Sequence, residues 1–357
     1  MPRFTVRLTT AVALLVATAC GADGGGGREL ATLDGVHAEP LPIEPQHFLG
    51  VDWVSTDEAV LTYLPSPDEV EPVVGRLTLS SGRLSEVKLP SRSPRCDFLR
   101  YFGATALSSR ELQIMRGCND SQDVTKDRLE LLIYDLPSGS TAMLADLGRD
   151  FRFVGFPSWD PRVSRGITSV TNQICSTLYW VDREGLHPLR VEVTDRGRTF
   201  QVGPELFGMK GGDCAALPRA DQPAWSPDGR EIAFWFSSPK PGVVGQARLD
   251  LPWSLHVMDP KTGHTRQLLT GVRGPGLPWW SPNGRWIAFS GSVDGSGSGT
   301  WLLSRDSLKL VRLTDSLSAF AWSPNGQAFL SAEDVPGANA WPPLRRLMLF
   351  DLPPSVG

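Results

Sequence analysis

The chain has 357 residues, with 35 Lys and Arg against 39 Asp and Glu, which gives a formal net charge of −4. Hydrophobic residues make up 41% and charged residues 21%, an ordinary balance that excludes wholesale disorder. A nucleic-acid partner is excluded as well, because the phosphate backbone demands concentrated positive charge and the sequence has no Lys/Arg run.

The first 19 residues have the pattern of a secretory signal peptide. Arg3 and Arg7 precede an apolar run over residues 11–19, which is too short to span a bilayer as a mature helix. Residues 17–20, Ala-Thr-Ala-Cys, resemble a bacterial lipobox, in which the cysteine becomes lipidated. We therefore expect Cys20 to hold the protein in membrane lipid on the extracytoplasmic side of the cell membrane, with the glycine-rich residues 20–27 as a tether. The alternative is ordinary cleavage that releases a free secreted protein.

A five-residue repeat organises the remainder of the chain. Trp-Ser-Pro-Asp/Asn-Gly begins at Trp225, Trp280 and Trp322, and an apolar strand pattern follows each copy. Proline fixes φ at the second position of a turn, and glycine closes it, so each copy predicts a tight hairpin of type I. A second hairpin pattern recurs downstream of each turn, so each unit has four antiparallel strands.

Six such units are predicted, and residues 28–357 are expected to form one all-β, six-bladed β-propeller. The first strands of the units end at Trp53, Phe102, Trp159, Trp225, Trp280 and Trp322. The last unit shows only three strands before two prolines, which cannot join a paired strand. We expect the N-terminal residues 28–33 to supply the fourth strand and close the ring.

The Trp-Ser-Pro-Asp/Asn-Gly repeat resembles the TolB-type β-propeller repeat, found in TolB and in the propellers of prolyl-oligopeptidase-like enzymes. The match is clear in the last three units and degenerate in the first three. This resemblance implies an envelope protein or peptide as partner, bound on the looped face or in the central funnel. It specifies the fold far better than the function.

Four cysteines remain after Cys20, and three pairings are possible. Cys96 and Cys118 flank the middle of a predicted hairpin, whereas Cys175 ends a second strand and Cys214 precedes the next unit. We expect the disulfides Cys96–Cys118 and Cys175–Cys214, formed in an oxidising compartment. The alternative is four reduced, buried thiols. A zinc site is disfavoured because the sequence has no Cys-x-x-Cys pair.

Long connections, among them the inter-unit stretch 193–222, gather on one predicted face, where binding concentrates in rigid scaffolds. Trp253 and Trp341 end long loops there and are the candidate ligand contacts. The sequence contains no Gly-x-Ser-x-Gly motif, and its five histidines show no metal-ligand spacing. We therefore predict a monomeric, non-catalytic protein- or peptide-binding module with no metal and no cofactor. The alternative is a lactonase-like hydrolase or lyase with a metal in the central channel.

Overall fold

The structure is a computed structural model that describes residues 33, 35–69, 71–91, 96–119, 127–148, 154–172, 175–204, 217–239, 251–317, 319–338, 342–354 and 356. The predicted signal peptide, the tether and Cys20 lie outside these residues. No helix in the described part of the chain is long and apolar enough to cross a membrane.

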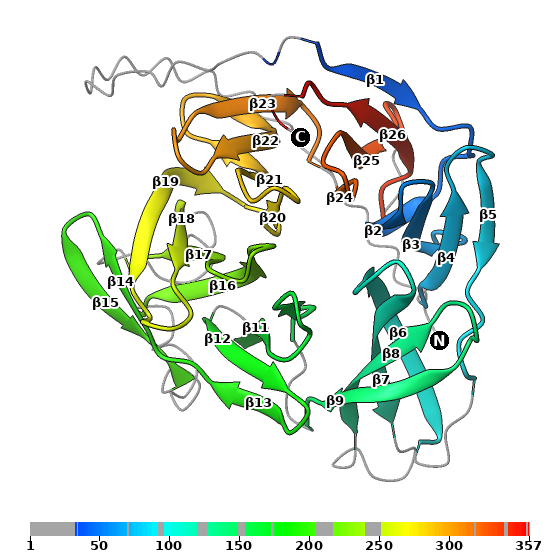
Figure 1. Ribbon diagram of the computed structural model, residues 1–357, viewed down its shortest axis with the longest axis horizontal. Coiled ribbons are helices and arrows are strands. Elements are labelled where there is room, and N and C mark those ends of the chain that lie inside the picture. The colour runs from blue at the N-terminus through cyan, green and yellow to red at the C-terminus, as the bar shows by residue number, and fades with distance from the viewer. Residues whose placement is uncertain are drawn as a thin grey trace, which may run out of the picture.

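Small antiparallel sheets surround a central axis in a β-propeller arrangement (Figure 1). The first sheet contains β2 (His47–Ser55), β3 (Glu58–Leu64), β4 (Val73–Thr78) and β5 (Arg83–Glu86). The second contains β6 (Phe98–Ala106), β7 (Glu111–Asn119), β8 (Arg128–Asp135) and β9 (Thr141–Asp146). The third contains β10 (Ser158–Trp159), β11 (Gly166–Asn172), β12 (Cys175–Asp182) and β13 (Gly185–Pro188). The all-β prediction is confirmed.

An eight-stranded sheet follows, and its two halves meet where β19 pairs with β21 through two residue pairs. Its strands are β16 (Arg219–Trp225), β17 (Ile232–Ser237), β18 (Trp253–Met258), β19 (Thr265–Arg273), β20 (Trp279–Trp280), β21 (Trp286–Val293), β22 (Gly297–Ser304) and β23 (Leu310–Thr314). The last sheet contains β24 (Ala319–Trp322), β25 (Ala328–Asp334), β26 (Arg345–Asp351) and β1 (His37–Pro40). In Figure 1, β2, β16, β20 and β24 lie toward the centre, and β5, β23 and β1 lie outside.

The repeated turn has the predicted geometry. In the first copy the N–H of Gly229 donates to the carbonyl of Ser226 at 2.9 Å, which closes the four-residue turn. The Ser226 hydroxyl accepts the N–H of Glu231 at 2.9 Å and donates to Asp228 at 2.7 Å. Gly229 has φ +67°, a left-handed conformation that glycine adopts without a Cβ clash. The motif is therefore a self-bonded turn that ends each inner hairpin.

The tryptophan of the repeat joins neighbouring units. The indole N–H of Trp53 donates to the carbonyl of Ala321 at 3.1 Å, and that of Trp280 donates to Ala224 at 3.0 Å. Trp322 donates to the carbonyl of Trp279 at 3.2 Å. Each bond crosses from one innermost strand to another, so the tryptophans fix the spacing of the strands around the axis.

The strand that completes the last sheet is not the predicted one. β1 pairs with β26 from His37↔Asp351 to Pro40↔Met348, so the added strand is His37–Pro40 and not residues 28–33. Of residues 28–33, only Leu33 is described, and it packs against the apolar core of the last sheet without belonging to a strand. The chain beyond β26 also contributes to this core, because the buried Val356 packs into it.

A two-stranded hairpin occupies part of the stretch 193–222, which we expected to be a loop. β14 (Val191–Asp195) pairs with β15 (Arg198–Val202), and the turn between them has positive φ at both Arg196 and Gly197. This is the backbone of a type I′ hairpin, whose twist matches that of the flanking strands. The hairpin contacts β19 at the outside of the propeller (Figure 1).

Candidate functional site

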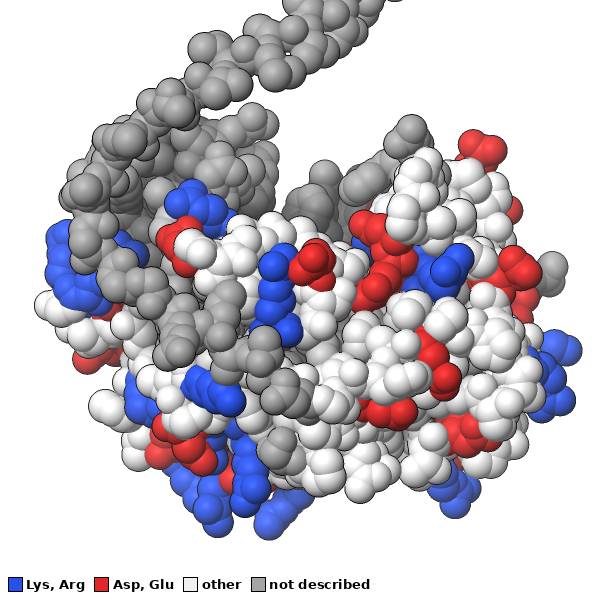
Figure 2. All heavy atoms as spheres, turned by 90° about the horizontal axis from the view of Figure 1, so that it is seen from above, with Lys and Arg blue, Asp and Glu red and all other residues white. Residues whose placement is uncertain are grey.

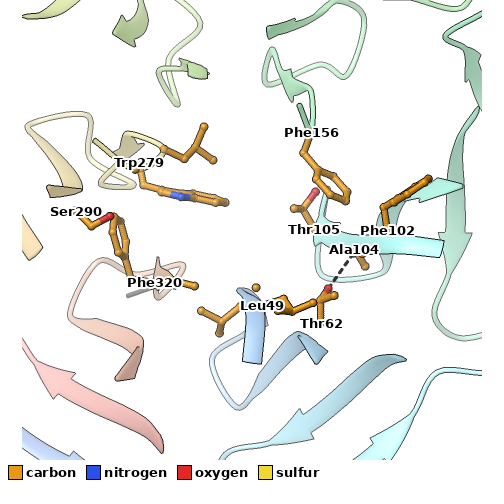
Figure 3. A pocket seen from close by; sticks show the side chains of 15 residues that line it. Leu49, Thr62, Phe102, Ala104, Thr105, Phe156, Trp279, Ser290 and Phe320 are labelled. Atoms are coloured by element: carbon orange, nitrogen blue, oxygen red, sulfur yellow. Dashed lines mark hydrogen bonds between the residues drawn. The ribbon is translucent and has the colours of Figure 1, made fainter. Parts of the chain in front are cut away.

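A pocket of about 320 Å³ lies at the centre of the propeller, and we call it the axial pocket. It is lined by Leu49, Gly50, Val51, Thr62, Phe102, Gly103, Ala104, Thr105, Phe156, Gly276, Leu277, Trp279, Ser290, Ala319 and Phe320. These residues lie on the innermost strands of several units, on the segments that enter those strands and, for Thr62 and Ser290, on the second strands β3 and β21. In Figure 3 Phe156 and Trp279 extend toward the pocket from opposite sides. The volume falls in the range of small-molecule and side-chain sites.

The lining of the axial pocket is apolar and aromatic, and part of it faces solvent. Leu49 is 42% exposed and Phe102 is 41% exposed, both high values for large hydrophobic side chains. Scattered exposed apolar residues are normal, but two that share one concave surface with a tryptophan and two more phenylalanines form a binding surface for an apolar group. Polar groups are few. The Thr62 hydroxyl is occupied by the N–H of Ala104 at 3.2 Å (Figure 3).

Bulges and glycines shape this pocket. The strand β2 shifts register between Phe48 and Gly50, and β6 shifts between Tyr101 and Gly103. Gly103 has φ +144°, and a Cβ there would lie 3.3 Å from the Phe156 ring. A Cβ on Gly276 would collide with the Ser290 hydroxyl. Bulges often occur beside functional sites because they redirect side chains, and here the residues next to them, Leu49 and Phe102, line the pocket.

A second pocket of about 230 Å³ adjoins the first, and we call it the acidic pocket. The two pockets share Thr105, Phe156, Leu277 and Trp279, so they lie side by side, and we call the two together the hollow. Among the described residues, the charged side chains that line the two pockets are Asp52 and Asp160, and both belong to the acidic pocket. The hollow is therefore apolar at one end and negatively charged at the other.

Asp52 is a buried carboxyl group on the innermost strand β2. It is 8% exposed, and its two oxygens accept the backbone N–H groups of Trp53 and Ala106, each at 2.8 Å. Burial outweighs these two hydrogen bonds and raises the pKa of Asp52 to about 7. The group is thus poised to change charge near neutral pH, which is typical of functional sites.

Asp160 lies in the turn after β10 and also lines the acidic pocket. Partial burial opposes its ionisation, but hydrogen bonds from the Ser164 hydroxyl and from the backbone N–H groups of Arg165 and Ser164 outweigh burial and lower its pKa. Asp160 is therefore ionised at neutral pH, and the acidic pocket carries at least one full negative charge.

The structure contains the predicted disulfide Cys96–Cys118, which links the start of the second sheet to β7. Cys175 is disulfide-bonded as well, but Cys214 lies outside the described residues, so the pairing Cys175–Cys214 stays a prediction. Trp341 also lies outside them. Trp253 is 9% exposed and packs under the Arg219 guanidinium at 4.5 Å. It is a buried residue of β18, and its role as a ligand contact stays a prediction.

The axial pocket was missed at the level of residues. The segments at the starts of the innermost strands, among them residues 48–52 and 318–321, carry few potential metal ligands. Their signal is different: Leu49, Ala319 and Phe320 are apolar residues where the innermost strands begin. The sequence predicts that the first strand of the second unit ends at Phe102, but β6 continues to Ala106. Phe102 therefore lies within the strand and faces the pocket.

Potential metal ligands come together elsewhere in the described chain. Asp182, Glu184 and His187 lie within 4.8 Å of one another on the exposed β12–β13 hairpin, and His187 contacts Asp182 at 2.9 Å. The other group combines Glu130 with the cysteines of the disulfide, whose sulfurs are not available as thiolates. Neither group lines the axial or the acidic pocket.

Comparison with known proteins supports the fold. No protein-family model matches the chain. The structure resembles TolB from Acinetobacter baumannii with a TM-score of 0.51 and 16% identity, over 83% of this chain and 63% of that one. It also resembles puromycin hydrolase with a TM-score of 0.49 and 16% identity, over 85% of this chain and 51% of that one. The predicted resemblance to TolB-type propellers is confirmed at the level of the fold.

One curated relative bears on function. The chain is 27% identical over 121 residues to the uncharacterized peptidase YuxL of Bacillus subtilis (strain 168), a match that covers 33% of this chain and 18% of the relative. The chain thus spans less than a fifth of that protein. Our prediction of a non-catalytic protein is wrong in the light of this match, which points toward hydrolases. It relied on the absence of a serine-hydrolase motif, and the loss of one motif does not remove a chain from a class of enzymes.

Proposed function

We propose that this propeller binds peptides for a hydrolytic reaction, with an apolar side chain of the peptide in the axial pocket. The observation that carries the proposal is the exposed apolar lining of that pocket, with Leu49 and Phe102 each more than 40% exposed at the centre of the propeller. Burial of such surface by a ligand is favourable by about 25 cal/mol per Å². The similarity to a peptidase supports peptides as the ligand class.

The test compares two capped tripeptides, acetyl-Gly-Phe-Gly-amide and acetyl-Gly-Ser-Gly-amide, by isothermal titration calorimetry. We expect measurable binding of the phenylalanine peptide and at least tenfold weaker binding of the serine peptide, because only the aromatic ring fills the pocket. Mass spectrometry of the same mixtures reports whether bound peptide is cleaved.

Two variants and a matched control locate the binding. Leu49→Ser and Phe102→Ser should each weaken binding of the phenylalanine peptide about fivefold, since each removes about 1 kcal/mol of apolar contact. Met143→Ser removes a side chain of similar size and exposure, 45%, from β9, outside both pockets. This control should bind like the wild type. Equal affinity for both peptides, or equal effects of all three substitutions, would contradict the proposal.

We propose further that the propeller has six blades of four strands, closed as a ring by β1. The eight-stranded sheet supports this count because it divides into β16–β19 and β20–β23 at the two residue pairs between β19 and β21. The pairing of β1 with β26 supports closure by an N-terminal strand. Deletion of residues 28–40 should then lower the melting temperature by several degrees, because it exposes the edge of β26.

We also propose that a lipid on Cys20 holds the protein at the outer side of the cell membrane. The lipobox-like sequence supports this proposal, and the disulfide Cys96–Cys118 is consistent with an oxidising compartment. Replacing Cys20 by Ala should move the protein from the membrane fraction to the soluble fraction of cell extracts. Unchanged partitioning would refute the anchor.

A further inference from the structure

The acidic pocket differs in chemistry from the axial pocket that it adjoins. Four residues line both pockets, so a ligand that fills the axial pocket lies close to the acidic pocket. A purely apolar ligand would leave the acidic end unused. The negative charge of the acidic pocket therefore indicates which second chemical group of the ligand lies beside the apolar group.

Asp52 is a buried carboxyl group without a cationic partner in the described part of the chain. Its hydrogen bonds come from two backbone N–H groups, which use one site on each oxygen, and no Lys, Arg or His side chain contributes to its charge balance. A carboxylate can accept about four hydrogen bonds, so about two sites remain. Buried carboxylates are normally paired with a cation, and the cavity beside Asp52 has room for one.

The lining of the acidic pocket includes a residue with an unusual backbone conformation. Val163 occupies the turn position that glycine holds in the repeats of Gly229, Gly284 and Gly326, and it shares their positive φ, at 53°. A β-branched residue is strained in this conformation. Val163 lines the acidic pocket, so this strained position puts an apolar residue into the lining where the other repeats have glycine.

We propose that an ammonium group of the bound peptide lies in the acidic pocket beside Asp52, while a neighbouring apolar side chain occupies the axial pocket. This inference rests on the proposed function. Asp160 adds negative charge to the same pocket, and Arg162 near it tempers that charge, so Asp52 is the main partner. The ammonium group is either a free peptide N-terminus or a lysine side chain, which have the same chemistry.

The experiment uses the purified full chain and four peptides in calorimetry at pH 8. Phe-Gly-amide has a free amino group, acetyl-Phe-Gly-amide has none, and acetyl-Phe-Lys-amide carries its ammonium on a side chain, with acetyl-Phe-Gln-amide as its neutral counterpart. We expect at least one of the two cationic peptides to bind about tenfold or more tighter than its neutral counterpart, as for a hydrogen bond to a charged group. The peptide with this advantage identifies the source of the ammonium group.

Variants then assign the effect to Asp52. Asp52→Asn should remove the advantage of the cationic peptide, so that the charged and neutral peptides bind this variant with equal affinity. Asp221→Asn is the matched control, because Asp221 lies on the innermost strand β16 and lines neither pocket. It should retain the advantage.

Two results would overturn the inference. One is equal affinity for the charged and neutral peptides in the wild-type protein, a comparison that does not depend on the folding of any variant. The other is an advantage that survives in a folded Asp52→Asn protein. In both cases binding of the neutral phenylalanine peptides would leave the proposed function standing, whereas failure of all phenylalanine peptides to bind would refute the proposed function itself.

Discussion

Replacement of Trp280 by Phe isolates the bond that joins neighbouring units. Its indole N–H donates to the carbonyl of Ala224 at 3.0 Å, and both residues are buried. Trp225 occupies the same position of the repeat, but its indole nitrogen is buried with no hydrogen-bond partner among the described residues. Trp225→Phe is therefore a matched control that removes the same atoms and no hydrogen bond.

The expected effect can be worked out from these contacts. Both substitutions remove part of a large ring and leave a small cavity, at a cost of about 1 to 2 kcal/mol each. Trp280→Phe also takes away the donor of a buried carbonyl, which adds about 1 to 3 kcal/mol. Trp225→Phe relieves an unpaired buried N–H, which lowers its cost. We expect Trp280→Phe to be more destabilising by about 2 kcal/mol.

Urea denaturation followed by circular dichroism at 218 nm, the wavelength at which strands are conventionally monitored, measures the two free energies of unfolding. Circular dichroism is preferable to fluorescence because each variant loses a tryptophan. The slope of the unfolding free energy against urea must stay the same in both variants, so that the difference reports stability alone. Equal destabilisation by the two substitutions would refute the claim that the indole bonds hold adjacent innermost strands together.

Three further predictions concern stability. His256 is fully buried, and burial lowers its pKa from 6.5 to about 4. Its neutral form therefore stabilises the fold above pH 6.5, and about 3 kcal/mol is lost as the pH falls from 6.5 to 4. His256→Leu removes this loss, so the variant should be more stable than the wild type at pH 4 in urea titrations, and an unchanged acid response would contradict this. Asp52 acts in the opposite sense, because its raised pKa makes the folded state gain a proton as the pH falls toward 4. Replacing Cys96 and Cys118 by Ala should cost about 3 kcal/mol, since their separation of 22 residues defines the loop that the disulfide closes, and thermal melts without reductant measure it. Gly284→Ala should cost about 1 kcal/mol from its φ of +69° alone, since the nearest atom to a new Cβ, in the Pro227 ring, lies 3.8 Å away. A neutral result would show that the turn relaxes.

The fold was predictable because the repeated turn is stabilised by hydrogen bonds between its own residues. The turn of Ser226 to Gly229 is bonded within itself, so its sequence alone specifies the hairpin. The hairpin of β14 and β15 was also legible, since Val191 to Val202 alternates apolar and polar residues around Arg196-Gly197. It was overlooked because it belongs to no repeat.

The site was less predictable because it depends on how separate units meet. Leu49, Phe156 and Phe320 are far apart in the sequence and become neighbours only when their sheets surround one axis. The burial of Asp52 likewise depends on Ala106, a residue of the next sheet.

The exposed strand β1 joins the beginning of the described chain to its end through four residue pairs with β26. A force that pulls on the N-terminus therefore loads the packing of Leu33 and then this short strand. β1 would detach while the inner sheets stay folded, and it could pair again once the force falls. The molecule thus has a weak mechanical link at its outer edge that shields the axial pocket from strain.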